Sequence, residues 1–349
     1  MDLGLTSEQE ALVASFTDLL SERSTTAHVR AAEPLGFDDA LWRVMLDVGV
    51  LEMAVPEERG GWGADLVDLA LVAERTGAAL APVPSVETQT AARLLAGLPA
   101  AAAAAGLEAV LAGEQLVTMA VRAARRGKAT LVPAGAVADS AIVLDGDALV
   151  LVSLNDANRK HVANLASAPL ADIEVAQPSA ASAAVELARG PDALAAWETA
   201  IDEWLTLTAA ALIGSATAAH RMTCEYARER QTWDKPIGTY QAVAHPLADA
   251  ATALDGARLL ARKAAWALSG GRERGENRGR ELAAMAFAFA AETARDVSYG
   301  AVHFHGGYGF TLEHDAQLHY RRARGWARVW GEPRKALLRV ASARYLKES

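Results

Sequence analysis

The residues best suited to chemistry form a basic and aromatic cluster late in the chain. Arg228, Arg230 and Lys235 surround Trp233, just before Pro236-Ile237-Gly238. An arginine can bind phosphate through two parallel N–H donors, and an indole can stack on a nucleobase. The same residues would also suit the solvated end of a helix, where cations offset the helix dipole. Residue types alone therefore leave two interpretations open, a phosphate or adenine clamp and a plain helix terminus.

Two glycine clusters could present backbone N–H groups to a phosphate. They are Gly60-Gly61-Trp62-Gly63 and His305-Gly306-Gly307-Tyr308-Gly309. Neither follows a predicted strand in the G-x-G-x-x-G register of a Rossmann turn, so we do not expect a Rossmann dinucleotide site. The first cluster is better explained as a structural turn.

Other reactive residue types lack the neighbours that their chemistry needs. His303 and His305 have no second histidine pair and no Glu-x-x-His at helical spacing, so we expect no metal site. No nucleophile elbow is present for acyl hydrolysis. The single cysteine, Cys224, cannot form an internal disulfide, and we expect it to be a small packed side chain.

The elements that must position these residues change character along the chain. Amphipathic helical periodicity predominates from residue 6 to about 112, short β-branched runs from about 113 to 190, and long helical patterns from about 192 to the end. We predict a mostly α, α+β fold with an N-terminal helical domain (1–112), a small β domain (113–190) and a C-terminal helical bundle (191–349).

Several local patterns give finer predictions. Thr6 to Glu10 has the pattern of a capping box, and Asp145-Gly146-Asp147 between two apolar runs predicts a β-hairpin. Three helices of more than twenty residues are expected at 212–233, 241–268 and 280–304.

Composition excludes some classes of partner. The chain has 349 residues, 52% of them hydrophobic, and a formal charge of -9. It therefore offers no basic field for nucleic acid or an anionic membrane. Because no signal peptide and no stretch of about 18 apolar residues is present, we expect a cytoplasmic protein.

Four segments, in order, are similar to motifs of one enzyme family. They are Leu5 to Glu10, Asp47 to Gly63 with its Pro-Glu-Glu-Arg-Gly-Gly-Trp-Gly, Arg230 to Ile237 (compare R-x-[QT]-F-G-x-P-I), and Ala301 to Phe310 (compare A-V-Q-x-x-G-G-x-G-[YF]). Together they resemble the acyl-CoA dehydrogenases, flavoenzymes that oxidise the Cα–Cβ bond of acyl-CoA thioesters. The resemblance covers nearly the whole chain and implies the family fold of a helical domain, a β domain and a C-terminal four-helix bundle.

In that family, one subunit reaches into its neighbour's flavin site and holds the ADP half of FAD. The resemblance assigns such contacts to six residues here: Arg230 on the pyrophosphate, Thr232 as a polar contact, Trp233 in the aromatic position, and His303, Gly306 and Gly307 beside the ADP. His303, Trp233 and Asp234 replace the usual Gln, Phe and Gly. The carboxylate of Asp234 would repel a pyrophosphate.

The resemblance does not extend to the segment that, in the family, contacts the flavin bound by the same subunit. The stretch from Val117 to Arg126 contains nothing like the T-E-P-x-A-G-S-D segment that contacts flavin and substrate in the family. The β domain is also short. The chain therefore resembles a family member that keeps only the contacts made to a neighbour.

The catalytic base is the second departure from the family. Members abstract the substrate α-proton with a glutamate in one of two places, and ungapped counts put Trp330 and Trp204 at those places. An indole cannot replace a carboxylate in this step. Glu332 and Glu203 lie close by in sequence, so a short slip in the count would restore a base.

The leading hypothesis is a subunit of a heteromeric (α2β2) FAD-dependent acyl-CoA dehydrogenase, with no catalytic residue of its own. A homologous partner would supply the base and bind most of the acyl-CoA. The resemblance also implies electron-transfer flavoprotein as acceptor and a bulky acyl group, such as a steroid side chain, although the acyl group and the partner's identity are not readable here. The alternatives are a self-sufficient acyl-CoA dehydrogenase that uses Glu332 or Glu203 as base, and a flavin-free scaffold subunit.

Overall fold

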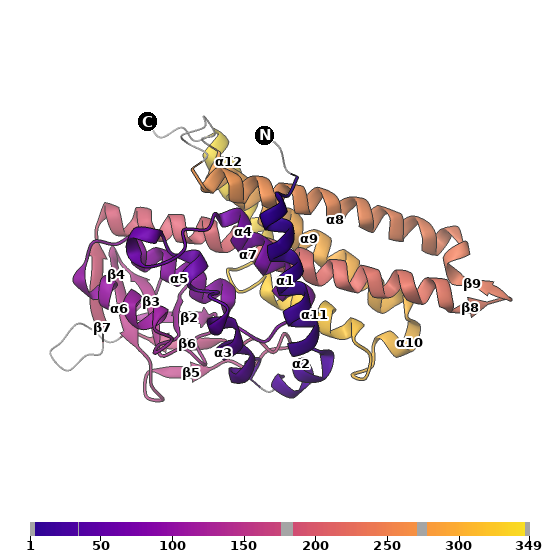
Figure 1. The fold of residues 1–349 in the computed structure, drawn as a ribbon, viewed down its shortest axis with the longest axis horizontal. Coiled ribbons are helices and arrows are strands. Elements are labelled where there is room, and N and C mark those ends of the chain that lie inside the picture. Colours follow the sequence, from indigo (N-terminus) through magenta and orange to yellow (C-terminus); the bar gives the residue numbers. More distant parts are fainter. Residues whose placement is uncertain (1–3, 34, 176–183, 271–277, 346–349) are drawn as a thin grey trace. The chain divides into compact units, whose positions relative to one another are not determined.

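The computed structural model describes residues 4–33, 35–175, 184–270 and 278–345 (Figure 1). Contacts between Cα atoms divide the chain into two compact units. The first unit comprises residues 1–29, 70–81 and 205–349, and the second comprises residues 30–69 and 82–204. The three-domain boundaries expected from the sequence stay a prediction.

The N-terminal part is helical, as expected. Its elements are α1 (Ser7–Arg23), α2 (Thr26–Ala32), α3 (Asp39–Asp47), the 3-10 helices η1 (Glu52–Ala54) and η2 (Glu57–Arg59), α4 (Leu66–Ala78), α5 (Ser85–Ala96) and α6 (Ala101–Leu111). The capping box is confirmed: the Thr6 hydroxyl accepts from the Gln9 amide, and the Gln9 side chain accepts from the Thr6 amide, both at 3.2 Å. These bonds satisfy N–H groups at the start of α1 that have no partner within the helix.

The middle of the chain forms two small sheets. The strands are β1 (Val117–Met119), β2 (Lys128–Val132), β3 (Ser140–Asp145), β4 (Ala148–Ser153), β5 (Arg159–His161), β6 (Ala171–Glu174) and β7 (Ala184–Arg189). One sheet has the order β1-β3-β4-β7 and the other β2-β6-β5. The predicted hairpin is confirmed, because β3 and β4 pair antiparallel up to Asp145 and Ala148, and Gly146 between them has a φ of +63°.

The two sheets share one apolar core. Alternate residues of β3 and β4 pack with residues of β2 and β6, and include Ala141, Val143, Val150, Val152 and Ile173. Since side chains alternate between the faces of a strand, one face of each sheet supplies this core.

The C-terminal part is a bundle of long helices followed by shorter ones. Its elements are α7 (Pro191–Glu229), β8 (Gln231–Thr232), β9 (Lys235–Pro236), η3 (Ile237–Thr239), α8 (Gln241–Leu268), α9 (Gly279–Phe304), α10 (Gly306–Gly309), α11 (Ala316–Trp326), η5 (Pro333–Lys335) and α12 (Ala336–Tyr345). The predictions for α8 and α9 are confirmed. The helix expected at 212–233 was wrong at both ends, since α7 begins at Pro191 and ends at Glu229.

Small side chains bring the bundle helices close together. The bundle core is rich in alanine, including Ala209 and Ala216 of α7, Ala257 and Ala264 of α8, and Ala286, Ala290 and Ala294 of α9. Helix α4 approaches α7 even more closely through two glycines. A Cβ on Gly77 would lie 2.0 Å from the Ala211 carbonyl oxygen, and one on Gly214 would lie 1.9 Å from that of Glu74.

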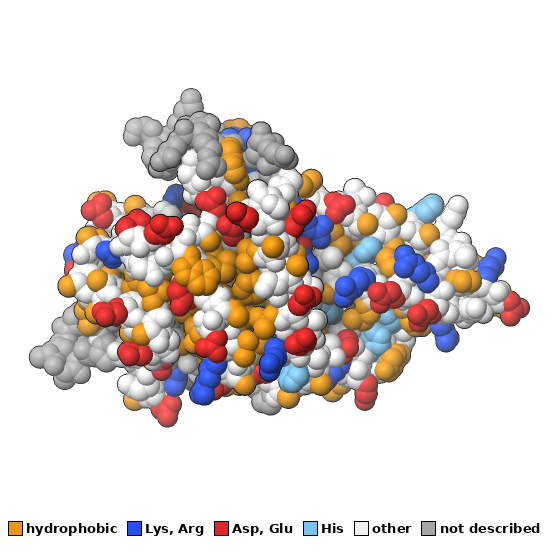
Figure 2. Space-filling view, in the orientation of Figure 1, with side chains coloured by type: hydrophobic (Ala, Val, Ile, Leu, Met, Phe, Trp, Pro, Cys, Tyr) orange, Lys and Arg blue, Asp and Glu red, His pale blue; other side chains and the backbone are white. Residues whose placement is uncertain are grey.

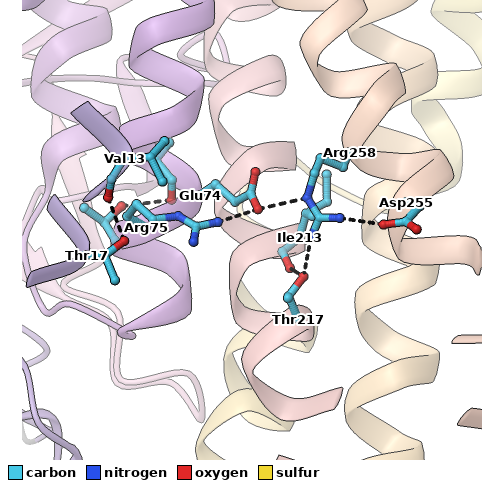
Figure 3. Close-up of polar contacts among 10 residues, drawn as sticks. Val13, Thr17, Glu74, Arg75, Ile213, Thr217, Asp255 and Arg258 are labelled. Carbon is cyan, nitrogen blue, oxygen red and sulfur yellow. Dashed lines mark hydrogen bonds and ion pairs between the residues drawn. The ribbon is translucent and has the colours of Figure 1, made fainter. Parts of the chain in front are cut away.

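A buried carboxylate also ties α4 to the bundle (Figure 3). Glu74 accepts hydrogen bonds from Arg75 at 2.6 Å and from Arg258 of α8 at 3.0 Å. Arg258 donates in addition to Thr217 of α7 at 2.9 Å and to Asp255 at 2.8 Å. Glu74 of α4 is thereby connected directly to α8 and, through Arg258, to α7.

Candidate functional site

The first candidate segment is a strained hairpin that follows α7. Strands β8 and β9 pair Thr232 with Lys235, so Trp233 and Asp234 alone form the loop. Both have positive φ, 55° and 60°, as a type I′ turn requires. Glycine or asparagine usually occupies such positions, and a bulky residue there costs about 1–3 kcal/mol. Trp233 therefore lies at a hairpin tip, and not in the helix expected from the sequence.

The base of the hairpin is braced. The Tyr240 hydroxyl donates to the Thr232 carbonyl at 2.9 Å, and the Ile237 amide donates to the Arg230 carbonyl at 2.8 Å. The Lys235 ammonium lies over the Tyr240 ring, 5.3 Å from its centroid. The brace holds Trp233 in solvent, where its side chain is 86% exposed.

The second candidate segment is the junction of α9 and α10. His303 in the last turn of α9, Gly306 and Gly307 are all exposed. Gly306 has a φ of +65°, which explains a glycine there. Gly307 has no positive φ, and a Cβ on it would meet nothing within 4 Å, whereas a Cβ on Gly309 would lie 2.6 Å from the Val302 carbonyl oxygen. Packing within the described chain thus accounts for Gly309 but leaves open space at Gly307.

The two segments lie at the same end of the bundle, where β8, β9 and α10 are drawn together in Figure 1. An apolar cluster of Ala219 from α7 with Ala301 and Val302 from α9 joins the helices that carry them. The rings of Tyr226 and His305 add a contact, with centroids 4.4 Å apart. Basic, acidic and histidine side chains mingle over this end of the bundle in Figure 2.

All six residues assigned by resemblance are therefore on the surface. Arg230, Thr232 and Trp233 lie on the hairpin, and His303, Gly306 and Gly307 lie at the α9–α10 junction. His303 also lines a groove of about 510 Å³ between α7, α8 and α9. A ligand held by these residues would stay open on one side unless another surface covered it.

Trp204, which the ungapped count puts at the first base position, is a core residue. Trp204 is 1% exposed and is among the largest fully buried side chains. Beside it, desolvation raises the pKa of the Glu87 carboxyl of α5 from 4.5 to about 7, although the Trp204 indole opposes part of this rise. The sequence analysis missed Glu87, because no local motif marks it.

Glu203, the carboxylate next to Trp204 in the sequence, forms a bidentate ion pair with Arg93. Arg93 of α5 donates to its two oxygens through Nε at 2.9 Å and Nη2 at 2.8 Å. Burial alone would lower the pKa of Arg93, but the charge and hydrogen bonds of Glu203 raise it above its ordinary value. Both residues line a groove of about 500 Å³. Proton abstraction by Glu203 would first require this pair to break.

Trp330, at the second base position by the ungapped count, is also a packed indole. Trp330 meets Phe287 edge to face, with ring centroids 6.0 Å apart, and the Arg339 guanidinium lies 5.9 Å from the indole centroid. Glu332 is exposed, and its carboxylate lies 3.5 Å from the Arg328 guanidinium. Of the two carboxylates that could restore a base, Glu332 is the less constrained.

Among the described residues, no group of three or more His, Cys, Asp or Glu side chains could hold a metal ion. No helix in the described ranges has the length and hydrophobicity needed to cross a membrane.

Comparison with known proteins identifies the family. Residues 6–114 match the acyl-CoA dehydrogenase N-terminal domain, and residues 194–332 match its C-terminal domain. Acyl-CoA dehydrogenase IpdE2 of Mycolicibacterium smegmatis is 30% identical over 96% of this chain and 98% of its own length. Acyl-CoA dehydrogenase FadE27 of Mycobacterium tuberculosis is 30% identical over 93% of each chain.

Solved structures agree with this match. A chain in the crystal structure of the ChsE4-ChsE5 complex from Mycobacterium tuberculosis superposes with a TM-score of 0.86 at 27% identity, over 100% of both chains. Butyryl-CoA dehydrogenase from Megasphaera elsdenii has the same fold, with a TM-score of 0.84 at 20% identity, over 98% of this chain and 99% of that one. The chain belongs to the acyl-CoA dehydrogenase family.

Proposed function

We propose that this chain is the non-catalytic subunit of a heteromeric, FAD-dependent acyl-CoA dehydrogenase. It would contribute ADP-side contacts to a flavin site whose remaining walls, base and acyl pocket belong to a homologous partner. When bound there, FAD supplies the oxidant for α,β-desaturation of an acyl-CoA. Family membership supports the reaction class, and the similarity to a chain of the ChsE4-ChsE5 complex supports a homologous partner.

One observation carries the proposal: the candidate FAD contacts are an exposed surface at the end of the bundle. Trp233 is 86% exposed on a braced hairpin. A stacking residue held rigidly in water is prepared for a ligand or a second protein, because ordering has already occurred before binding. In this arrangement Arg230 would bind the pyrophosphate and Trp233 would stack on a flat ring.

The space at Gly307 fits the same arrangement. Its backbone is open to approach, and no contact within the described chain requires a glycine there. A bare backbone N–H beside a helix can bind a phosphate oxygen that a side chain would keep away. His303, one turn earlier, can donate a hydrogen bond to the same ligand.

The indoles at the two base positions support the absence of catalysis by this chain alone. Trp204 fills core volume, and Trp330 packs on Phe287. Indoles at these two positions are expected of a subunit that does not abstract the proton itself.

The experiment is co-expression of the chain with its homologous partner. We expect the chain purified alone to be colourless, and the complex to contain one FAD for each pair of unlike subunits. Arg230→Gln and Gly307→Ala should each lower the flavin content of the complex. Arg43→Gln is the control, since it removes an exposed arginine of α3 that is not part of the candidate site.

Other outcomes select the alternatives. Stoichiometric FAD on the isolated chain would contradict the proposal. If that preparation also oxidised acyl-CoA, and Glu332→Gln abolished the oxidation, the self-sufficient enzyme would be correct; the exposure of Glu332 is the observation that favours it. If Arg230→Ala with Trp233→Ala left the flavin content of the complex unchanged, the chain would be a scaffold.

A further inference from the structure

Four aromatic side chains form a continuous stack at the end of the bundle that carries the candidate FAD contacts. The ring centroid of Tyr226, on α7, lies 4.4 Å from that of His305, which lies between α9 and α10. The His305 centroid lies 4.3 Å from that of His314, in the segment after α10. Tyr308 of α10 meets His314 edge to face, with centroids 4.8 Å apart. We call these four residues the aromatic stack.

Hydrogen bonds to the backbone fix both imidazoles of the aromatic stack. His305 is 4% exposed, and its Nδ1 donates to the Ala301 carbonyl oxygen at 2.7 Å, because a carbonyl oxygen can only accept. The Ala316 amide donates to Nδ1 of His314 at 3.0 Å. A ring nitrogen that accepts this bond carries no proton, so His314 is neutral in this arrangement. The two imidazoles can therefore lie in contact without repulsion between two positive charges.

The aromatic stack reaches both segments of candidate FAD contacts. Tyr226 lies one helical turn before Arg230, and its carbonyl oxygen accepts from the Arg230 amide at 2.8 Å. His305 immediately precedes Gly306 and Gly307 in the chain. The contact between the Tyr226 and His305 rings thus joins the end of α7, where the hairpin begins, to the α9–α10 junction.

Helix α10 is held against His305 from two sides. On one side, a Cβ on Gly309 would lie 2.7 Å from the His305 Cβ and 2.6 Å from the Val302 carbonyl oxygen, so only glycine allows this approach. On the other side, the ring of Tyr308 contacts that of His314. A helix of four residues has little stability of its own, so these contacts are needed to keep it in place.

We infer that His305 and His314 are positioning residues for the FAD contacts of the proposed function, on which this inference rests. Their stacked rings hold Gly306 and Gly307 at a fixed place relative to Arg230. A pyrophosphate contacted from both segments binds more tightly when their separation is set beforehand, because binding then does not have to order α10 as well.

The test compares two variants of His314 that keep different parts of its contacts. His314→Phe keeps a ring against His305 and Tyr308 but cannot accept from the Ala316 amide, whereas His314→Asn can accept but has no ring. In the co-expressed complex, His314→Asn should raise the FAD dissociation constant by about two- to tenfold, the range expected for a lost aromatic pair. His314→Phe should raise it much less. If His314 only stabilised the fold, FAD affinity would instead follow the melting temperature of each variant.

Hydrogen exchange in the isolated chain gives a second measurement that needs no flavin. His314→Asn should speed exchange of the backbone amides at 304–310, while exchange in the sheet β1-β3-β4-β7 stays unchanged. His28→Ala is the matched control, since it removes an exposed histidine of α2 whose Nδ1 also makes a local hydrogen bond, at 2.9 Å to the Thr25 hydroxyl. It should change neither the exchange at 304–310 nor the FAD affinity.

Arg230→Gln separates this inference from the proposed function. It should lower the flavin content of the complex while leaving exchange at 304–310 unchanged. If Arg230→Gln lowers the flavin content, but His314→Asn leaves the exchange unchanged or weakens FAD no more than His314→Phe does, the positioning role alone is refuted. If neither Arg230→Gln nor His314→Asn changes the flavin content, the FAD contacts themselves are wrong, and the inference is refuted together with the proposed function.

Discussion

Replacing Glu203 with Gln should destabilise the chain substantially, because it leaves the guanidinium of Arg93 without its counter-charge. The side chain of Glu203 is 9% exposed and that of Arg93 is 22% exposed. Burial would lower the pKa of Arg93, but the charge and hydrogen bonds of Glu203, with a further contribution from the charge of Asp65, raise it above its ordinary value. Without the Glu203 carboxylate, no attraction offsets the desolvation free energy of the buried Arg93 charge.

The magnitude follows from this burial. Breaking a fully buried pair costs about 3–5 kcal/mol, whereas an exposed pair contributes about 0–1 kcal/mol. Water reaches about a fifth of Arg93, and Gln can still accept one hydrogen bond. We therefore expect Glu203→Gln to lower the free energy of unfolding by about 2–3 kcal/mol.

The assay is urea unfolding followed by far-UV circular dichroism. Asp39→Asn is the control, because its pair with Arg43 is exposed and should contribute less than about 0.5 kcal/mol. The double variant Arg93→Met with Glu203→Met should recover part of the loss, since no charge stays buried. If Glu203→Gln cost no more than the control, or if it abolished acyl-CoA oxidation while leaving stability intact, the structural role assigned to Glu203 would be refuted.

The remaining predictions concern ionisation and close packing. Because the pKa of Glu87 in the folded state is raised to about 7, its favourable contribution to the free energy of unfolding is complete below pH 4.5 and is lost as pH rises through 7. Urea unfolding of Glu87→Gln should therefore lack this pH dependence, and at alkaline pH the variant should be more stable than the parent chain by at most about 3 kcal/mol. Burial lowers the pKa of His319 to about 4, so the unfolded state takes up its proton first and stability should fall as pH drops from 6.5 to 4; His319→Gln should abolish that part of the pH dependence. Gly77→Ala should lower the melting temperature strongly, because its Cβ would lie 2.0 Å from the Ala211 carbonyl oxygen, whereas Gly307→Ala in the isolated chain should leave the melting temperature unchanged. An equal shift for both glycine variants would contradict the distinction between packing and open space.

Local patterns in the sequence predicted the regular elements well. The capping box at Thr6, the hairpin around Gly146 and the extents of α8 and α9 each depend on residues within a few positions of one another. Helical periodicity and turn chemistry act over this range, so the sequence carries their full description.

The end of α7 could not be predicted in this way. A type I′ turn is normally recognised by glycine or asparagine at its two central positions, and here they are Trp233 and Asp234. The helical pattern therefore continued through them in the prediction. The turn is held by the distant brace from Tyr240, which no local preference reveals.

The surroundings of the base positions were equally hidden. Arg93 and Glu203 are 110 residues apart, and Glu87 reaches Trp204 only because α5 lies beside α7 in the folded chain. Sequence counting indicated which residues occupy the two positions, but not that one indole is buried and the neighbouring carboxylate is paired. The six FAD contacts stay a prediction, to which the structure adds their exposure.

The tryptophan at the hairpin tip is also an intrinsic fluorescent probe. Trp233 is one of eight tryptophans, and its indole projects from a braced turn into water with 86% of its surface exposed. The emission difference between the chain and its Trp233→Phe variant would isolate this one fluorophore. If the Trp233 emission obtained in this way is quenched as the partner is titrated in, a flat ring or a protein surface has come to cover the hairpin tip. The measurement needs no added label.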